Sequence, residues 1–131
     1  MSCDRNEDDN GAATPPTTEG FSWRENSTSA PLKTAGASEV RTQYNSIFAF
    51  TGTTSTSGTL FEFNLTAVTP GTYQVNSSNL FYFNGNTATP STGKVVITSN
   101  ANGKASGTFE ATWSSGSVNS VYGTFTDIPV K

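Results

Sequence analysis

From Phe21 onward, apolar and polar residues alternate with a period of two, which predicts β-strands. The clearest alternation runs from Lys104 to Trp113, with Ala105, Gly107, Phe109, Ala111 and Trp113 on one face and Ser106, Thr108, Glu110 and Thr112 on the other. Successive side chains of a strand point to opposite faces, so this segment predicts a strand with one buried and one solvated face. Residues 59–66 and 118–127 repeat the pattern, with Phe61, Phe63 and Leu65 on one face of the first and Val121, Gly123 and Phe125 on one face of the second.

Turn residues separate these segments at intervals of roughly 8–12 residues. Pro70-Gly71 and Ser114–Gly116 are turn sequences, and Asn100–Gly103 supplies the positive-φ residues of a hairpin. Leu80–Phe83 is apolar on both faces, which predicts a strand that is covered on both sides. Further strands are expected at 21–23, 39–44, 46–51, 72–76 and 94–98. The whole pattern predicts an all-β domain over residues 21–131, an antiparallel β-sandwich or barrel of about 8–10 strands.

The tripeptide Gly-Thr-Phe occurs twice, at 107–109 and at 123–125, in two strands that we expect to pair. A glycine inside a strand leaves room for a neighbouring group to approach the backbone closely. We therefore expect each glycine to let an aromatic ring of the adjacent strand lie across it.

Residues 1–20 have a different composition and no hydrophobic periodicity. Acidic residues, Pro15-Pro16 and several Gly and Thr residues bury too little apolar surface to offset the entropy lost on ordering, so a disordered tether is expected. Cys3 is the only cysteine, so it has no intrachain disulfide partner. Ser2 before it suits the small-residue position of a signal-peptidase cleavage site, which makes Cys3 the expected lipidation residue.

The charge of the chain is concentrated in this tether. The net charge is −3, of which residues 1–19 contribute −4 and the remaining residues +1. The expected β-domain is therefore nearly neutral and has no cluster of Lys and Arg to neutralise phosphates, which argues against a nucleic-acid partner.

Few residues have the chemistry that catalysis needs. The chain contains no histidine, which removes the Ser-His-Asp and Cys-His arrangements and the commonest metal ligand, so no cofactor or metal site is expected. Paired carboxylates remain an enzymatic option, and Glu62 and Glu110 are the pair considered, because both lie on the polar face of an alternating strand. Solvated surface charges explain both residues more simply, so we expect no catalytic residues and no enzymatic activity.

Aromatic residues are the better binding candidates, with Trp23, Trp113 and Tyr122 as possible ligand-binding residues. An exposed aromatic ring stacks on the apolar face of a sugar while nearby amides and hydroxyls bond its hydroxyl groups. Exposure of two of the three rings on one face would support this hypothesis, and full burial of all three would exclude it. The other partner considered is a protein at the cell surface that docks at an exposed strand edge.

Two features carry a resemblance to a known family. Cys3 followed by the acidic residues Glu7, Asp8 and Asp9 resembles the mature start of surface lipoproteins of the Bacteroidota, in which such a patch is an export signal. The domain is similar to small all-β lipoprotein domains of unknown function from the same group, through the segments Phe21–Trp23, Gly71–Val75, Gly93–Thr98, Ala105–Phe109 and Val121–Phe125.

The resemblance implies a non-enzymatic protein anchored by lipid at Cys3 in the outer membrane and exposed at the cell surface. Its membrane partner is then the bilayer that holds the acyl chains. The family that the chain resembles has no catalytic residues that could be assigned to positions of this sequence.

Overall fold

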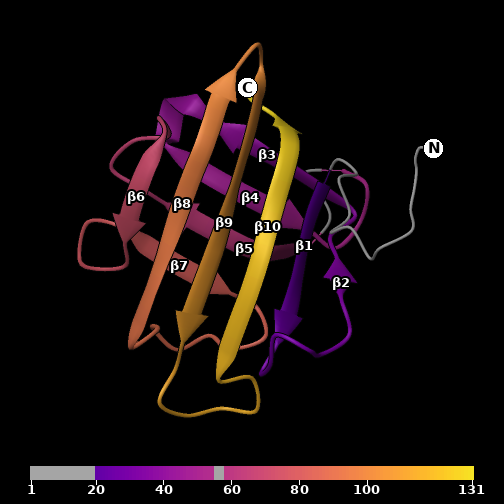
Figure 1. Ribbon diagram of the computed structural model, residues 1–131, viewed down its shortest axis with the longest axis vertical. Coiled ribbons are helices and arrows are strands. Elements are labelled where there is room, and N and C mark those ends of the chain that lie inside the picture. The colour runs from indigo at the N-terminus through magenta and orange to yellow at the C-terminus, as the bar shows by residue number, and fades with distance from the viewer. Residues whose placement is uncertain (1–19, 55–57) are drawn as a thin grey trace, which may run out of the picture.

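The computed structural model describes residues 20–54 and 58–131, which form two antiparallel β-sheets packed face to face (Figure 1). The predicted all-β class is confirmed, and the form is a sandwich, because neither sheet closes into a barrel. The six-stranded sheet has the order β2-β1-β10-β9-β8-β6. Its strands are β2 (Lys33–Thr34), β1 (Gly20–Glu25), β10 (Ser120–Pro129), β9 (Lys104–Thr112), β8 (Thr92–Ala101) and β6 (Gly71–Gln74).

The second sheet has four strands in the order β3-β4-β5-β7, and they cross behind the six-stranded sheet in Figure 1. Its strands are β3 (Ala37–Arg41), β4 (Ser46–Phe50), β5 (Thr59–Asn64) and β7 (Leu80–Phe83). A 3-10 turn at Thr42–Tyr44 ends β3 earlier than the strand expected at 39–44. The tether, with Cys3, Glu7, Asp8 and Asp9, lies outside the described residues apart from Gly20, which begins β1.

Aromatic rings from both sheets fill the space between them. The ring of Phe61 in β5 lies 5.2 Å from that of Phe21, 4.5 Å from that of Phe83 and 5.2 Å from that of Phe109, centroid to centroid. All four residues belong to one buried cluster, with Ile47, Val95, Val121 and Ile128 around them. These are the inward positions of the alternating segments, so burying them is what brings the two sheets together.

The two Gly-Thr-Phe tripeptides pair with each other across β9 and β10, as predicted. Thr108 lies opposite Thr124, so Gly107 faces Phe125 and Gly123 faces Phe109. A Cβ built on Gly107 would lie 2.6 Å from Cζ of the Phe125 ring, and one on Gly123 would collide with the Phe109 ring. Each phenylalanine therefore lies across the glycine of the other strand, and both rings remain in the core.

The last residues of the described chain connect the two sheets. A bulge between Phe125 and Ile128 turns β10, and Asp127 there has a φ of 49° and a backbone N–H that donates to Ser106 Oγ. Beyond the strand, Lys131 N donates to the carbonyl of Val40 at 2.8 Å. The Lys131 carbonyl accepts from Thr42 N at 2.9 Å. The chain thus passes from the six-stranded sheet to β3 of the other sheet.

An ion-pair cluster lies at this connection. The carboxylate of Glu39 in β3 accepts a hydrogen bond from Arg41, and Lys131 Nζ lies 3.5 Å from it. Burial raises the pKa of the Glu39 carboxyl, but Arg41 and Lys131 outweigh this effect, so the pKa lies below its ordinary value.

We expect this lowered pKa to give the protein an acid-dependent stability term. Above the ordinary pKa of Glu39 the stabilisation is fully present, and it is lost as the pH falls through the lower pKa of the folded state, because the unfolded chain then binds more protons. Glu39→Gln should flatten this part of the curve of unfolding free energy against pH, measured by urea denaturation. At neutral pH it should cost about 1.5–3 kcal/mol, the usual contribution of a hydrogen bond to a charged group.

Glu110→Gln removes the same charge without touching Glu39, and should keep the acid slope. An unchanged slope in Glu39→Gln would show that the cluster does not contribute to acid stability.

The prediction for Leu80–Phe83 was wrong in one respect. Phe81 and Phe83 enter the core, but β7 is the edge of the four-stranded sheet and its other face is open to solvent. Tyr82 on that face is 50% exposed. Apolar residues on both faces of a short strand therefore do not require cover on both sides, since Tyr82 keeps its hydroxyl in water.

Candidate functional site

The outer face of the six-stranded sheet carries a row of polar side chains that crosses four strands. Arg24 in β1 lies opposite Tyr122 in β10, Tyr122 opposite Glu110 in β9, and Glu110 opposite Lys94 in β8. Residues directly opposite in neighbouring strands have adjacent side chains. We call Arg24, Tyr122, Glu110 and Lys94 the Tyr122 row. It places one aromatic ring between a cation and a carboxylate, with a second cation beyond.

A second row of short side chains lies beside it on the same face. Ser22, Thr124, Thr108 and Val96 are opposite one another in the same four strands. Ser22 Oγ lies 3.5 Å from Thr124 Oγ1, and the hydroxyls of Thr108 and Thr124 are on exposed residues. Because these side chains are short, the surface beside Tyr122 is low and lined by hydroxyl groups.

The parts of the two rows that lie in β1, β10 and β9, together with a neighbouring loop, line a shallow hollow of about 900 Å³. Ser22, Thr124 and Thr108 line its floor with Tyr122 and Glu110, while Thr28 and Leu32 of the β1–β2 loop form its rim. The guanidinium of Arg24 donates to the carbonyl of Ala30 in that loop. One of its five N–H donors is thereby used to hold the rim, and others remain for a ligand.

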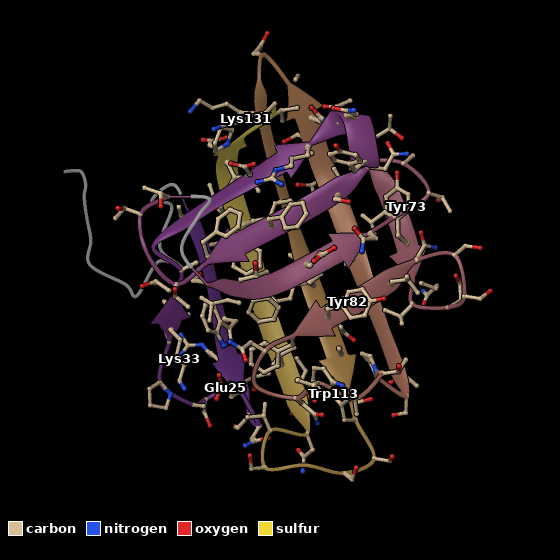
Figure 2. The ribbon with its side chains drawn as sticks, turned by 180° about the vertical axis from the view of Figure 1, so that it is seen from behind. Glu25, Lys33, Tyr73, Tyr82, Trp113 and Lys131 are labelled. Carbon is tan, nitrogen blue, oxygen red and sulfur yellow. The ribbon has the colours of Figure 1, made fainter. Side chains whose placement is uncertain are left out.

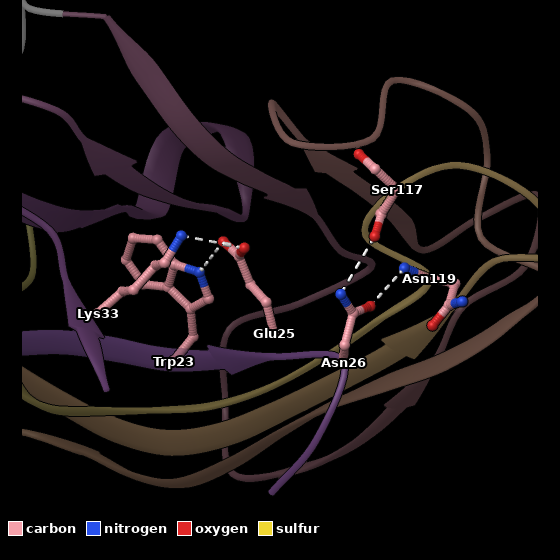
Figure 3. A network of polar contacts seen from close by, with 6 residues as sticks. All are labelled: Trp23, Glu25, Asn26, Lys33, Ser117 and Asn119. Carbon is pink, nitrogen blue, oxygen red and sulfur yellow. Dashed lines mark hydrogen bonds and ion pairs between the residues drawn. The ribbon is translucent and has the colours of Figure 1, made fainter. Parts of the chain in front are cut away.

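A polar network holds the end of β1 and so fixes the position of this rim (Figure 3). Asn26, with a φ of 69°, accepts from Asn119 N at 2.8 Å and donates to the Ser117 carbonyl at 3.1 Å. Asparagine tolerates this left-handed conformation better than most residues. On the other side, Glu25 accepts from Trp23 Nε1 at 3.0 Å and from Lys33 Nζ at 3.1 Å. The β1–β2 loop is therefore tied to the β9–β10 loop at one end and to β2 at the other.

The three aromatic residues named from the sequence lie in different environments. Trp23 and Trp113 are only 4% and 5% exposed and belong to the core, so they have no free ring face for stacking. Their indole N–H groups are also bonded, that of Trp113 to the carbonyl of Ala88 at 2.8 Å. Tyr122 alone lies on an outer face, and the expected platform of at least two exposed rings from this set is not formed.

The carboxylates considered as a catalytic pair are far from facing each other. Glu62 lies on the outer face of the four-stranded sheet and Glu110 on the outer face of the six-stranded sheet, with the core between them. Within residues 20–54 and 58–131, no three potential metal ligands gather in one place. No helix in the same part of the chain has the length and apolar character needed to cross a membrane.

Sequence reasoning missed Arg24 and Lys94, because each lies in a different strand and the row exists only through their pairing. Alternation alone places both on polar faces, but the register that aligns them links β1 to β10 and β8 to β9.

The edges of the six-stranded sheet offer little to a docking strand of a partner protein, since the edge strands β2 and β6 have only 2 and 4 residues.

Comparison of the chain with family models, curated proteins and solved structures finds no match in any of the three. The structure alone therefore defines the class of protein, an antiparallel β-sandwich with a polar hollow on its six-stranded sheet.

Proposed function

We propose that this protein is a non-enzymatic, lipid-anchored module of the cell surface that binds carbohydrate in the hollow beside Tyr122. The observation that carries the binding proposal is the Tyr122 row, with its aromatic ring next to both hydrogen-bond donors and an acceptor. A carbohydrate offers an apolar ring face and several hydroxyls, each of which donates and accepts. Among the residues that line the hollow, Arg24 supplies donors and Glu110 supplies an acceptor, while Thr108 and Thr124 supply groups that do both.

The geometry favours a sugar over an apolar ligand. The hydroxyl side chains of Ser22, Thr108 and Thr124 line the hollow, and Tyr122 is the aromatic residue of its lining that is not buried, since Phe109 and Phe125 belong to the core. The hollow is open along the sheet, so it can accept part of a longer polymer. Stacking on Tyr122 would supply affinity, and the flanking polar groups would select among hydroxyl arrangements.

The expected result of Tyr122→Ala is loss of glycan binding with little change in stability. The wild-type protein and this variant would be applied to an array of neutral and acidic oligosaccharides, and hits would be titrated by calorimetry. Loss of the ring should weaken binding about 10-fold or more, given about 1.4 kcal/mol for each factor of ten. Tyr82→Ala on the opposite sheet is the matched control, and it should bind as wild type does. Equal binding by the wild type and Tyr122→Ala, or no hit on the array, would refute the carbohydrate proposal.

The anchoring part of the proposal rests on the tether. Cys3, followed by Glu7, Asp8 and Asp9, supports acylation at the cysteine and export of the protein to the surface of the outer membrane. Two acyl signals are enough for stable membrane attachment. Mass spectrometry of the native protein extracted from membranes tests this, since an acylated Cys3 is expected at the mature N-terminus. A chain with a free Cys3 thiol, recovered from the cytosol, would contradict it.

A further inference from the structure

The outer face of the four-stranded sheet carries a second cross-strand row, and this row contains carboxylates and aromatic rings only. Glu39 in β3 lies opposite Phe48 in β4, Phe48 opposite Glu62 in β5, and Glu62 opposite Tyr82 in β7. Figure 2 shows this face, with Tyr82 on the side of the sheet away from the core. We call Glu39, Phe48, Glu62 and Tyr82 the acidic-aromatic row.

One half of this row already holds a cation from the chain itself. The guanidinium carbon of Arg41 lies 4.5 Å from the centroid of the Phe48 ring, and the same side chain donates to Glu39. An arginine over an aromatic face is attracted by the negative potential of the ring, and the adjacent carboxylate supplies the opposite charge. The pair Glu39 and Phe48 is thus a guanidinium site that Arg41 occupies.

The other half of the row has the same chemistry and no cation within the described residues. Glu62 and Tyr82 line a common hollow of about 370 Å³, with Leu60, Asn84 and Thr87 around them. Glu62 accepts a hydrogen bond from Asn64 Nδ2 at 2.9 Å, and no ion pair of the described chain includes it. Glu25 and Glu39, by contrast, each pair with Lys or Arg.

From this arrangement we infer that Glu62 and Tyr82 form a binding site for the guanidinium group of an arginine side chain on a partner protein. The half-exposed ring of Tyr82 offers a face to the cation, and Glu62 offers carboxylate oxygens for its N–H groups. The charge of the hollow is complementary to a basic group, since its lining contains one carboxylate and no Lys or Arg. Arg41 beside Phe48 shows the same recognition within this very sheet. The site lies on the sheet opposite the Tyr122 hollow and does not depend on it.

The test is a titration of the isotope-labelled protein with N-acetylarginine amide at low ionic strength, followed by amide and aromatic NMR shifts. Saturable shifts should centre on Glu62, Tyr82 and their neighbours in β5 and β7. N-acetylcitrulline amide has the same shape without the charge, and should bind at least threefold more weakly. Added salt should weaken arginine-amide binding, because screening reduces the attraction between exposed charges.

Variants separate the two parts of the site. Glu62→Gln and Tyr82→Leu should each weaken binding about threefold to tenfold, in line with the small energies of exposed ion and cation–π pairs. Tyr82→Phe keeps the ring face and should retain binding, which also guards against misfolding as the explanation. Glu110→Gln on the opposite sheet is the charge-matched control and should bind as wild type does.

Three outcomes would overturn the inference. The first is equal binding of the arginine and citrulline amides. The second is a set of shifts that centres on the Tyr122 row. The third is binding of glucosamine at Glu62 in the absence of binding by the arginine amide, which would assign the site to an amino sugar.

Discussion

Replacing Phe61 with alanine is expected to lower the free energy of unfolding by about 3–5 kcal/mol, the usual cost of removing a large core ring. Phe61 is fully buried and contacts rings from both sheets, with Trp23 at 5.0 Å and Phe83 at 4.5 Å between centroids. The cavity left by the substitution would lie at the centre of the sandwich, where neither sheet can close it without shifting. Since domains have total stabilities of about 5–15 kcal/mol, the variant would retain only part of its fold stability.

Urea denaturation followed by the fluorescence of Trp23 and Trp113 would measure this loss. The midpoint should fall while the dependence on urea concentration stays the same, because the surface exposed on unfolding hardly changes. Tyr44→Ala is the control, since Tyr44 is 61% exposed and its loss should change stability by no more than about 0.5 kcal/mol. Similar midpoints for the two variants would contradict the central role of Phe61.

The second large effect is expected from a methyl group added at Gly107. Gly107→Ala would place its Cβ against the backbone carbonyl oxygen of Val96 and 2.6 Å from Cζ of Phe125. The ring can rotate or shift, but the carbonyl belongs to the β8–β9 ladder, so the strands themselves must move apart. Overpacking of this kind costs about 1–3 kcal/mol and sometimes more, and we expect the upper end of that range here.

Gly58→Ala is the matched control for Gly107→Ala. A Cβ at Gly58 would have its nearest contact at 3.4 Å, to Thr51 Oγ1, which is ordinary van der Waals distance. It should leave the thermal midpoint unchanged or raise it slightly, because alanine restricts the unfolded chain. A thermal midpoint for Gly107→Ala equal to that of Gly58→Ala would show that the close approach at Gly107 is not required.

Alternation along single strands was enough to predict the fold class and most of the core. Phe61, Phe63, Phe109 and Phe125 all occupy inward positions that their segments predicted. The paired Gly-Thr-Phe tripeptides were also predicted, because a strand glycine has few uses other than a close approach. These features depend on local sequence, on a period that the backbone imposes and on turns between neighbours.

The parts that were not predictable depend on which strands become neighbours. The rings of Phe48 and Phe50 stack on each other 6.0 Å apart outside the core cluster, although Phe50 is only 2% exposed, while Ile47 and Ala49 belong to that cluster. The local sequence of this strand does not determine which of its two apolar faces packs against the other sheet. The Tyr122 row has the same origin, because it aligns strands that lie about a hundred residues apart.

The pairing of β1 with β10 has a consequence for the order in which this protein becomes structured. Among the described strands the first, β1, is completed only by the last, β10, so Phe21 and Trp23 cannot be fully enclosed until residues 120–129 are available. Contacts of such long sequence separation make folding slow, because the entropy of closing a long loop is lost before the contacts between its ends stabilise the chain.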